Sequence, residues 1–298
     1  MTPTETGPSG PVCNRLSKTA GGTTNYTYDR ADRMLTAGAM AVTVDANGNM
    51  TAKGSDTFGF DQANRMTAGT VAGASETYTY DGDGTRLSRQ VGANPAIRYV
   101  SDVALGLPST IDDATRRYVY GLGLTYAVSG TAIDVYHADR LGSVRALTNA
   151  SGTVSATHRT DEWEITRATS GSSTQPLGFT GEPRDRTSLT YLRSRYYDPG
   201  LGRFASRDTW TGSMATSGTQ NRFAYVGDNP ATNADPSGRC FVDTFADIAF
   251  VAYDVISLIF GPEKDRGTNW LSFGADAGAA ALPCVTGAGL IVRLGKLS

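Results

Sequence analysis

The sequence predicts a mainly β protein built from repeated β-hairpins, followed by a short α-helical segment at the C-terminal end. Three observations support this fold class. The 298 residues include 35 Gly, together with many Thr and Tyr, which favours strands separated by tight turns. An aromatic or β-branched residue followed by Asp recurs at a fixed spacing in the first third of the chain. After residue 238 the composition changes abruptly to an apolar, Ala-rich stretch.

The repeat is clearest at Asp29, Asp45 and Asp61, which lie sixteen residues apart, and Asp81 follows twenty residues later. The pairs Arg33-Met34, Asn49-Met50 and Arg65-Met66 recur at the same step of sixteen residues. A fixed period of this size indicates one supersecondary unit stacked on copies of itself. Each unit reads as strand, turn, strand, with Asp-, Asn- and Gly-rich turns that tolerate positive φ.

The four repeated aspartates admit two interpretations. Carboxylates recurring at a fixed spacing occur in calcium-binding repeats, but a calcium site needs several oxygens from one loop, and only 81–84 supplies a local cluster. We favour the simpler interpretation that each Asp accepts hydrogen bonds from the amides of its own turn. No metal or other cofactor is predicted.

Further strands are predicted at 98–100, 117–120 and 133–136, where residues alternate with period two. The stretch 160–175 is polar, with Ser, Thr and Gly crowded at 169–174, and is predicted to be a loop.

Two blocks carry a family resemblance. The stretch from 191 to 238 contains, in order, YLRSRYYDP at 191–199, GRF at 202–204, Asp208, NP at 229–230 and DPSG at 235–238, and an upstream block reads YHADRLGSVRAL at 136–147. These resemble the RHS repeat-associated core and its YD repeats, a family that includes C components of insecticidal toxin complexes. The resemblance covers roughly 25–238. It implies a long β-spiral shell. Where the family usually has a DAFG segment, this chain has DEWEI at 161–165.

The resemblance divides the chain into four parts. Residues 1–24 are expected to be disordered or a truncated edge, 25–130 a YD-repeat sheet, 131–239 the RHS-associated core, and 240–298 a helical linker of the kind that precedes toxins. The fold class is therefore a partial β-spiral shell closed by an RHS core, with a short helical segment at the end.

Composition excludes several function classes. The net charge of −2 lacks the positive excess that is typical of nucleic-acid-binding proteins. The three cysteines at 13, 240 and 284 have neither disulfide-framework nor metal-site spacing. The N-terminus has no basic and apolar signal-peptide regions, so we expect synthesis in a bacterial cytoplasm and display or secretion without a cleavable signal in this chain.

Motifs for nucleophilic or metal catalysis are absent from the sequence, which leaves carboxylates as the candidate chemistry. Asp208, Asp228 and Asp235 precede the point after residue 238 where the composition changes. Two carboxylates that share a site can keep one proton between them, so that one acts as acid while the other activates a water molecule. Arg207 is the predicted cation that holds one of them ionised.

The resemblance implies self-cleavage after a DPxGL motif by an aspartyl-protease-like site. The matching segment is 235–239, which includes Gly238 and places the junction between Arg239 and Cys240. Asp208 matches the family's core Asp; Asp228 is our first choice for the second acid and Asp235 the next. Two residues depart from the pattern: Arg239 stands in place of Leu and Thr209 in place of Pro. An apolar pocket for Leu would solvate a guanidinium poorly, which predicts slow or absent cleavage. The competing interpretation is that these aspartates only cap turns and form ion pairs.

The segment 240–298, after the change in composition, is predicted to be helical. Apolar residues at helical spacing predict an amphipathic helix over 241–259, and a second apolar run spans 277–292. That run is shorter than a membrane span and contains Pro283, so we favour a packed helix pair over membrane contact during toxin delivery.

The chain resembles a toxin-delivery protein of bacterial competition. Its expected partners are missing N-terminal shell repeats and a C-terminal toxin cargo, with an immunity protein or a secretion apparatus as further partners. A non-enzymatic surface scaffold and a truncated remnant without its toxin remain alternatives.

Overall fold

The computed structural model describes residues 12–239, except for residues 20, 105–106, 122, 172–174 and 213–216. The helical segment predicted for 240–298, and Cys240 with it, lies outside the described residues. Within the described part, the chain folds into antiparallel sheets with short 3₁₀ turns, as the fold class predicted from the sequence requires.

Two large sheets follow chain order, each strand pairing with its neighbours in sequence. The first sheet contains ten strands: β1 (Ser17–Thr19), β2 (Thr23–Tyr28), β3 (Met34–Ala37), β4 (Met40–Val44), β5 (Met50–Lys53), β6 (Asp56–Phe60), β7 (Met66–Val71), β8 (Ala74–Tyr80), β9 (Arg86–Val91) and β10 (Ile97–Arg98). The second contains eight: β11 (Val100–Asp102), β12 (Ser109–Asp112), β13 (Arg117–Tyr120), β14 (Leu124–Ser129), β15 (Ala132–Ala138), β16 (Val144–Thr148), β17 (Val154–Thr160) and β18 (Thr166–Gly171).

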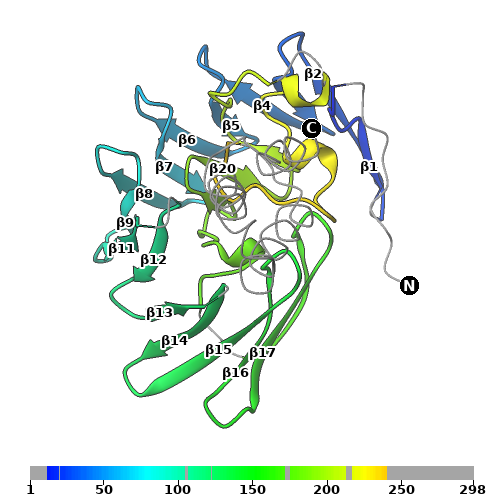
Figure 1. Cartoon of the computed structure of the whole chain (residues 1–298). Helices are drawn as coiled ribbons and strands as arrows, with labels where there is room; N and C mark the ends of the chain where they lie inside the picture. Colours follow the sequence, from blue (N-terminus) through cyan, green and yellow to red (C-terminus); the bar gives the residue numbers. More distant parts are fainter. Residues whose placement is uncertain are drawn as a thin grey trace, which may run out of the picture.

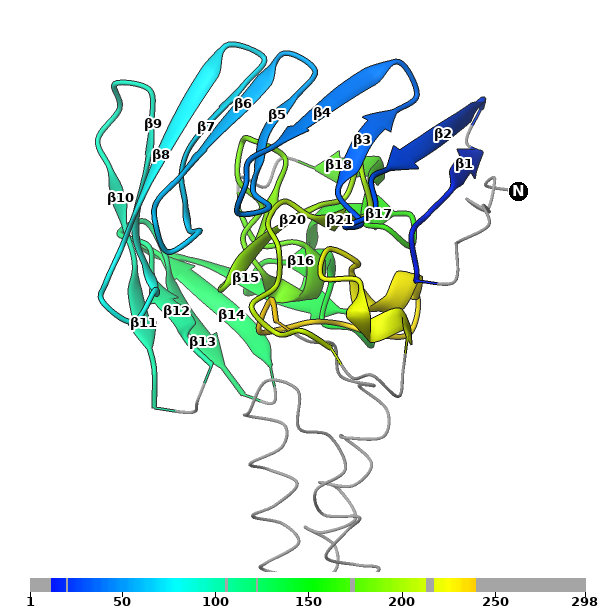
Figure 2. The ribbon, with the colours of Figure 1, turned by 90° about the horizontal axis from the view of Figure 1, so that it is seen from above.

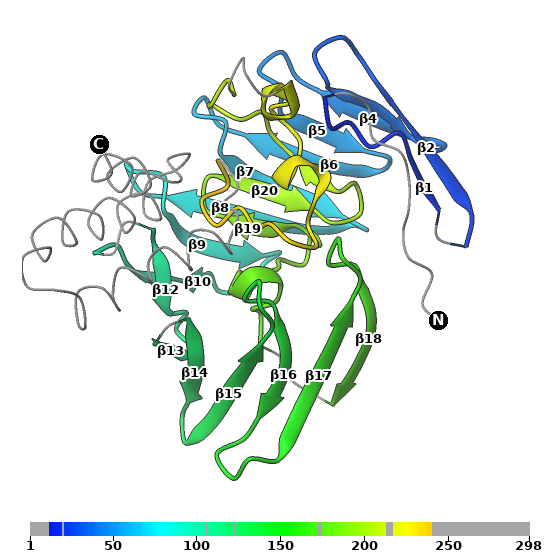
Figure 3. The same cartoon turned by 45° about the vertical axis from the view of Figure 1, so that its right-hand side comes forward.

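A core segment from 175 to 239 lies between the two large sheets, which curve around it (Figures 1 and 2). It contains a three-stranded sheet of β19 (Thr190–Leu192), β20 (Arg195–Asp198) and β21 (Arg203–Phe204). Three short 3₁₀ turns complete it: η1 (Phe179–Gly181), η2 (Ser217–Gln220) and η3 (Val226–Asp228). Figure 3 shows β19 and β20 against the concave face of the first sheet.

The sixteen-residue period is one hairpin of the sheet. Its turn begins at an Asp whose Oδ1 accepts amide hydrogens two and four residues later, for example from Ala31 and Arg33 at Asp29. Two-donor turns of the same kind begin at Asp61, Asp81, Asp139 and Asp161. In the turn that begins at Asp45, Oδ1 accepts the amide hydrogen of Asn49, four residues later. The prediction that the repeated aspartates cap their own turns is confirmed.

Each of these turns places the residue three positions after the Asp in the left-handed region. The residues there are Asp32, Gly48, Asn64, Gly84, Gly142 and Glu164, with φ from +60° to +93°. Gly, Asn and Asp adopt this region most readily. Glu164 is the exception, because it occupies the position of the Gly in the DAFG segment. The DEWEI sequence therefore keeps the turn, but it places a residue with a carboxylate in the left-handed region.

The hydrophobic cores follow the alternation of the strands. Met34, Met50 and Met66 begin alternate strands of the first sheet and are 1–5% exposed. They pack with core-segment residues that include Leu189 and Tyr196. Tyr197, the next residue of β20, faces the opposite side and packs with Phe179, Leu192, Phe204, Tyr225 and Val226. The core segment is therefore sandwiched, with one hydrophobic cluster on each face of β20.

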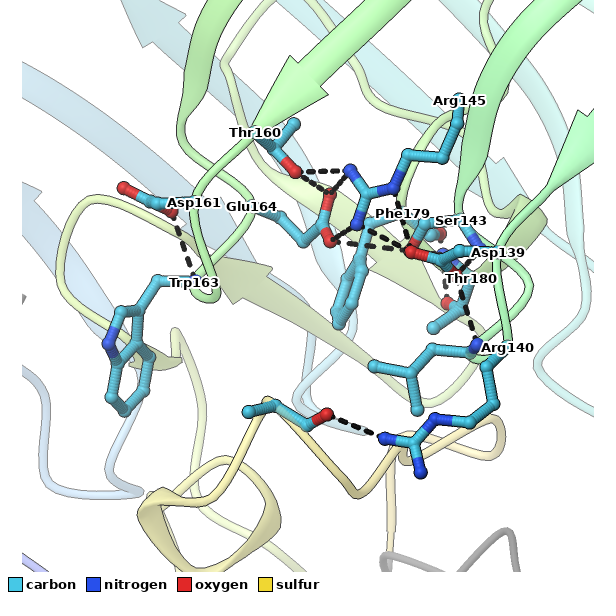
Figure 4. A network of polar contacts seen from close by, with 12 residues as sticks. Asp139, Arg140, Ser143, Arg145, Thr160, Asp161, Trp163, Glu164, Phe179 and Thr180 are labelled. Carbon is cyan, nitrogen blue, oxygen red and sulfur yellow. Dashed lines mark hydrogen bonds and ion pairs between the residues drawn. The ribbon is translucent and has the colours of Figure 1, made fainter. Parts of the chain in front are cut away.

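A polar network joins the second sheet to the core segment (Figure 4). Arg145 Nη2 lies 2.6 Å from Asp139 Oδ2 and 2.9 Å from Glu164 Oε1. The Ser143 hydroxyl donates to Glu164 Oε1 and accepts the amide hydrogen of Thr180 in η1. The extra carboxylate of Glu164 therefore fastens the β17–β18 turn to β16 and, through Ser143, to the core segment.

Trp163, beside Glu164 in the same turn, points away from this network (Figure 4). Its ring lies 4.2 Å from the Arg15 guanidinium, and its backbone carbonyl accepts the Tyr197 hydroxyl. Arg15 also lies over Tyr26 of β2, at 5.9 Å. Arg15, which precedes β1, thus lies between the last turn of the second sheet and Tyr26 of the first sheet.

The structure differs from the sequence predictions at β18 and bears on the predicted boundary at 130–131. The stretch 160–175 was predicted to be a loop, but β18 occupies Thr166–Gly171 and pairs with β17. The prediction was wrong because every β18 side chain is exposed, so its polar composition reflects an edge strand with no buried face. The predicted boundary at 130–131 falls in the hairpin between β14 and β15, within the second sheet. The division into domains stays a prediction.

Candidate functional site

Arg195, the first residue of β20, lies at the centre of the site. Alternation along the strand places its side chain on the same face as Tyr197, inside the second hydrophobic cluster of the core segment. Its guanidinium lies 3.5 Å from the centre of the Phe204 ring, and its side chain is only 6% exposed. A cation this deeply buried requires carboxylate partners.

Two of the predicted aspartates supply those partners. Asp208 follows β21, and its Oδ2 lies 2.7 Å from Arg195 Nη2, while Asp235 Oδ2 lies 3.4 Å from the same nitrogen. Asp208 is held from the other side by the amide hydrogen of Trp210, which its Oδ1 accepts at 2.9 Å. The chain therefore brings together two carboxylates separated by 27 residues around one guanidinium.

Burial shifts the protonation of this cluster. Desolvation raises the pKa of Asp208 to about 6, against the opposing effect of Arg195, and the neighbouring Asp235 raises it further. Desolvation also raises the pKa of Asp235, and it lowers that of Arg195. One cation facing two buried carboxylates favours a single shared proton, the arrangement that acid–base hydrolysis needs.

The DPSG turn is held by the same side chains. Asp235 Oδ1 accepts hydrogen bonds from the Ser237 hydroxyl and from the amide of Arg239, each at 3.1 Å. The carbonyl oxygen of Gly238 accepts a hydrogen bond from Arg195 Nε. Gly238 has φ +69°, and a Cβ there would lie 2.1 Å from the Leu192 carbonyl oxygen, so only glycine fits. The predicted junction residues Gly238 and Arg239 thus lie against the acid pair.

A small cavity of about 30 Å³ opens beside the acid pair. Arg195, Asp208, Asp235 and Arg239 are among the residues that line it. A space of this size admits a water molecule. The site therefore combines two carboxylates, a cation, a peptide group and room for water.

Asp228, the first choice for the second acid, lies in a different electrostatic environment. Desolvation raises its pKa to about 6, and the opposing charges are those of Arg15 and Arg203. It does not line the cavity beside Asp208. Its φ of +61° closes η3, in which Val226 also has positive φ. The structure thus brings Asp208 together with Asp235 and does not bring Asp228 to the same cation.

Arg207, the predicted cation, is exposed and lies in a separate depression of about 210 Å³ lined also by Asp208 and Arg239. The cation that contacts both carboxylates is Arg195, which sequence reasoning missed. A signal was present: in YLRSRYYDP, period-two alternation places Arg195 on the face of Tyr197, and a cation on a buried face needs an acidic partner. Its neighbour Arg193 pairs elsewhere, with Glu182 at 2.7 Å.

Arg239 does not occupy an apolar pocket. Its side chain is exposed, and its Nε donates to Ser194 Oγ at 3.0 Å. It also lines a depression of about 190 Å³ with Asp83 and Ser194. The surroundings of residue 239 are therefore polar, which suits the Arg found in place of Leu.

Neither a metal centre nor a membrane-spanning helix is found in the part of the chain that the structure describes. No group of three or more His, Cys, Asp or Glu side chains there could hold a metal ion. No described helix is long and apolar enough to cross a bilayer, and the apolar run at 277–292 lies outside the described residues.

Comparison with known proteins agrees with this architecture. The chain is 30% identical over 261 residues to the tRNA3(Ser)-specific nuclease WapA of Bacillus spizizenii, covering 83% of this chain and 11% of the relative. It is 28% identical over 246 residues to the double-stranded DNA deaminase toxin A of Burkholderia cenocepacia, covering 76% of this chain and 16% of that protein. The chain thus spans a small part of the curated relatives it matches.

A solved structure shows the same fold. The crystal structure of TcdB2-TccC3 superposes with a TM-score of 0.54 at 20% sequence identity, covering 72% of this chain and 14% of that one. The Teneurin YD-shell family model matches residues 13–230, which include both large sheets and most of the core segment. The chain therefore belongs to the Teneurin YD-shell family and is an RHS/YD-repeat protein related to bacterial toxins.

Proposed function

We propose that this chain is the shell-and-core part of a toxin-delivery protein, and that its core cleaves the chain at the 235–239 turn. The observation that carries the proposal is the convergence of Asp208, Asp235 and the DPSG turn on Arg195. In this mechanism one carboxylate activates a water molecule and the other protonates the leaving nitrogen. Arg195 stabilises the negative charge that develops on the carbonyl oxygen.

The sheets support the proposed delivery role. They curve around the core segment, and β1 and β18 leave strand edges that further repeats could extend (Figure 2). A cargo joined after the turn would be released from the shell by cleavage. The proposed partners are upstream shell repeats and a C-terminal toxin, with an immunity protein and a secretion apparatus acting on the complete protein. We propose secretion or surface display as the location.

The test is expression of residues 1–298 followed by intact-mass analysis. Wild-type chain is expected to yield two fragments, while Asp208→Asn is expected to stay intact, because its amide cannot accept the proton of water. Loss of general acid–base catalysis lowers the rate by about 10²–10⁴-fold. Asp228→Asn is the matched control, since Asp228 faces Arg15 and Arg203, and it is expected to cleave normally.

A non-enzymatic scaffold is the second candidate. The observation that favours it is the hydrogen bonding of Asp235, whose Oδ1 caps its own turn as the repeat aspartates do. A scaffold predicts one intact mass for wild type, Asp208→Asn and Asp228→Asn alike. That result would remove self-cleavage and leave the shell architecture unaffected.

A further inference from the structure

Two adjoining depressions lie beside Arg239, where the described part of the chain ends. The first is the depression of about 190 Å³ that Arg239 itself lines. The second is a cavity of about 340 Å³, lined by residues of the second sheet and of the core segment. We call the two together the exit groove, and four residues line both parts: Thr85, Pro108, Tyr191 and Arg193. The exit groove therefore begins at the point where the chain leaves residue 239.

The larger part of the exit groove has aromatic walls that are held in place. The Arg86 guanidinium lies 4.9 Å from the centre of the Tyr99 ring and 4.2 Å from that of Tyr191. Tyr120 is 39% exposed, and its hydroxyl donates to the carbonyl of Thr110 at 3.0 Å. A cavity of this volume is in the range of ligand pockets, and walls of tyrosine rings favour apolar and aromatic occupants.

A polar atom in the same wall has no partner. Tyr136 lines the cavity and is 6% exposed, and its hydroxyl is buried without a hydrogen-bond partner among the described residues. A buried hydroxyl without a partner is destabilising, so an occupant that brings an acceptor is favoured. The cations in the wall are already paired, Arg86 with Asp185 and Arg193 with Glu182. A peptide with apolar side chains suits these walls, because its backbone carbonyls are acceptors and it carries no net charge of its own.

The chain itself supplies such a peptide at the mouth of the exit groove. The sequence after Arg239 reads CFVDTFADI at 240–248, with Phe241, Phe245 and Ile248 at positions i, i+4 and i+7. This spacing places the three side chains on one face of the predicted helix, the pattern with which a helix enters a hydrophobic groove. Six residues reach at most about 20 Å from residue 239. A tether this short gives an effective concentration of about millimolar, which favours this segment over free ligands.

We propose that residues 240–248 dock in the exit groove, with Phe245 in the tyrosine-lined cavity. Asp243 and Asp247 then fall on the opposite face of the helix, toward water. Docking requires no bond to be cut, so the inference does not rest on the proposed self-cleavage. It fixes the start of the chain after residue 239 between the second sheet and the core segment.

Photo-cross-linking in the full chain tests where the segment lies. Phe245 is replaced by p-benzoylphenylalanine, the protein is irradiated, and the cross-linked peptides are identified by mass spectrometry. We expect cross-links to peptides that contain 108–124 or Tyr136. Thr244 is the matched control position, because on a helix it points about 100° away from Phe245 and should not give these cross-links. The measurement is made in the wild-type chain and in Asp208→Asn, so that its result does not depend on whether the chain is cut.

Hydrogen exchange tests whether the exit groove is what holds the segment. Phe245→Ala should lower the protection of the amides at 241–248 by about tenfold or more, given the contribution of one buried Phe side chain. Gly123→Trp fills the cavity that Gly123 lines and should have a similar effect. A Cβ at Gly123 meets no atom within 4 Å, so the fold accommodates the change. Gly22→Trp is the matched control, since a Cβ there is equally free and Gly22 does not line the exit groove.

Three results would each overturn the proposal. Equal cross-linking from positions 244 and 245 would show that the segment has no defined face toward the walls. Cross-links between chains, detected in a mixture of unlabelled and ¹⁵N-labelled protein, would assign the exit groove to a second copy. Unchanged protection of 241–248 in Gly123→Trp would show that the segment is held elsewhere. Self-cleavage is measured separately by intact mass, so failure of the docking proposal and failure of the proposed function are distinguishable.

Discussion

Arg195 Nη2 lies 2.7 Å from Asp208 Oδ2, with the two side chains only 6% and 7% exposed. Asp235 approaches the same nitrogen at 3.4 Å. Burial raises the pKa of each aspartate, and for Asp208 the charge of Asp235 adds to the rise. The pair is therefore both a structural tie within the core segment and the source of its candidate chemistry.

Replacing Arg195 is expected to destabilise the fold strongly. Arg195→Met leaves two buried carboxylates without their cation, and breaking a buried pair in this way costs about 3–5 kcal/mol. Arg195→Lys keeps the charge and is expected to cost less, although it loses the contact with the Gly238 carbonyl. The control is urea denaturation in the Asp208→Leu background, where Arg195 has already lost one carboxylate partner. Arg195→Met should then lower the free energy of unfolding by less than it does in the wild-type chain. An equal loss in both backgrounds would contradict the pairing of Arg195 with Asp208.

Stability is expected to rise on mild acidification because of Asp208. Its pKa in the folded chain is about 6, above the value of about 3.9 in an unfolded chain, so the folded state binds the proton more tightly. The free energy of unfolding should increase as pH falls through 6 toward 4, by up to about 3 kcal/mol. The difference between wild type and Asp208→Asn isolates this contribution, since Asp228 and Asp235 titrate in both. A difference that is constant from pH 4 to pH 7 would show that Asp208 is not shifted.

The rate of the proposed self-cleavage is expected to depend on the same group. Asp208 must be ionised to accept a proton from water, so the first-order rate constant should fall as pH drops below about 6. Refolding from urea into buffers between pH 4 and pH 9 starts the reaction, and gel densitometry gives the rate. A rate constant that increases steadily toward pH 4 would assign Asp208 the acid role instead.

Glu164 offers a test of the strained turn position. Its φ of +68° is unfavourable for any residue with a Cβ, while its carboxylate pairs with Arg145. Glu164→Ala keeps the strain and loses the ion pair, whereas Glu164→Gly loses the ion pair but relieves the strain. The Gly variant should therefore be more stable than the Ala variant by about 1 kcal/mol or more in chemical denaturation. Equal stabilities would show that the turn relaxes in the Ala variant.

Trp163 tests the contact between the two large sheets. Trp163→Ala removes a side chain that is 6% exposed and lies over Arg15, so it should destabilise the chain by about 3–5 kcal/mol. Because Arg15 precedes β1, hydrogen exchange should accelerate in β1 and β2, far from residue 163 in sequence. Leu35→Ala, at an exposed position of β3, is the control for a general loss of protection. Acceleration confined to β17 and β18 would contradict a contact between the sheets.

Much of the fold could be predicted because its determinants are local. An Asp that accepts two amide hydrogens, a left-handed residue three positions later and period-two alternation along each strand all lie within one sixteen-residue unit. Turn chemistry and the strand period therefore specify the hairpins from Asp29 to Asp81 without reference to the rest of the chain. The edge strand β18 escaped prediction because it has no buried face to leave an apolar pattern.

The candidate site, like the fold, could be predicted from the sequence only in part. The motif order in the sequence indicated Asp208, Asp235 and Gly238, and the sequence by itself determined the turn that holds Gly238. Only the tertiary structure decided that Arg195, rather than Arg207, is the shared cation, and that Asp228 faces Arg15 and Arg203. The reason is physical: which charges meet depends on how β20, β21 and the DPSG turn pack across 40 residues of chain, and burial then sets their pKa values. No local pattern specifies that packing.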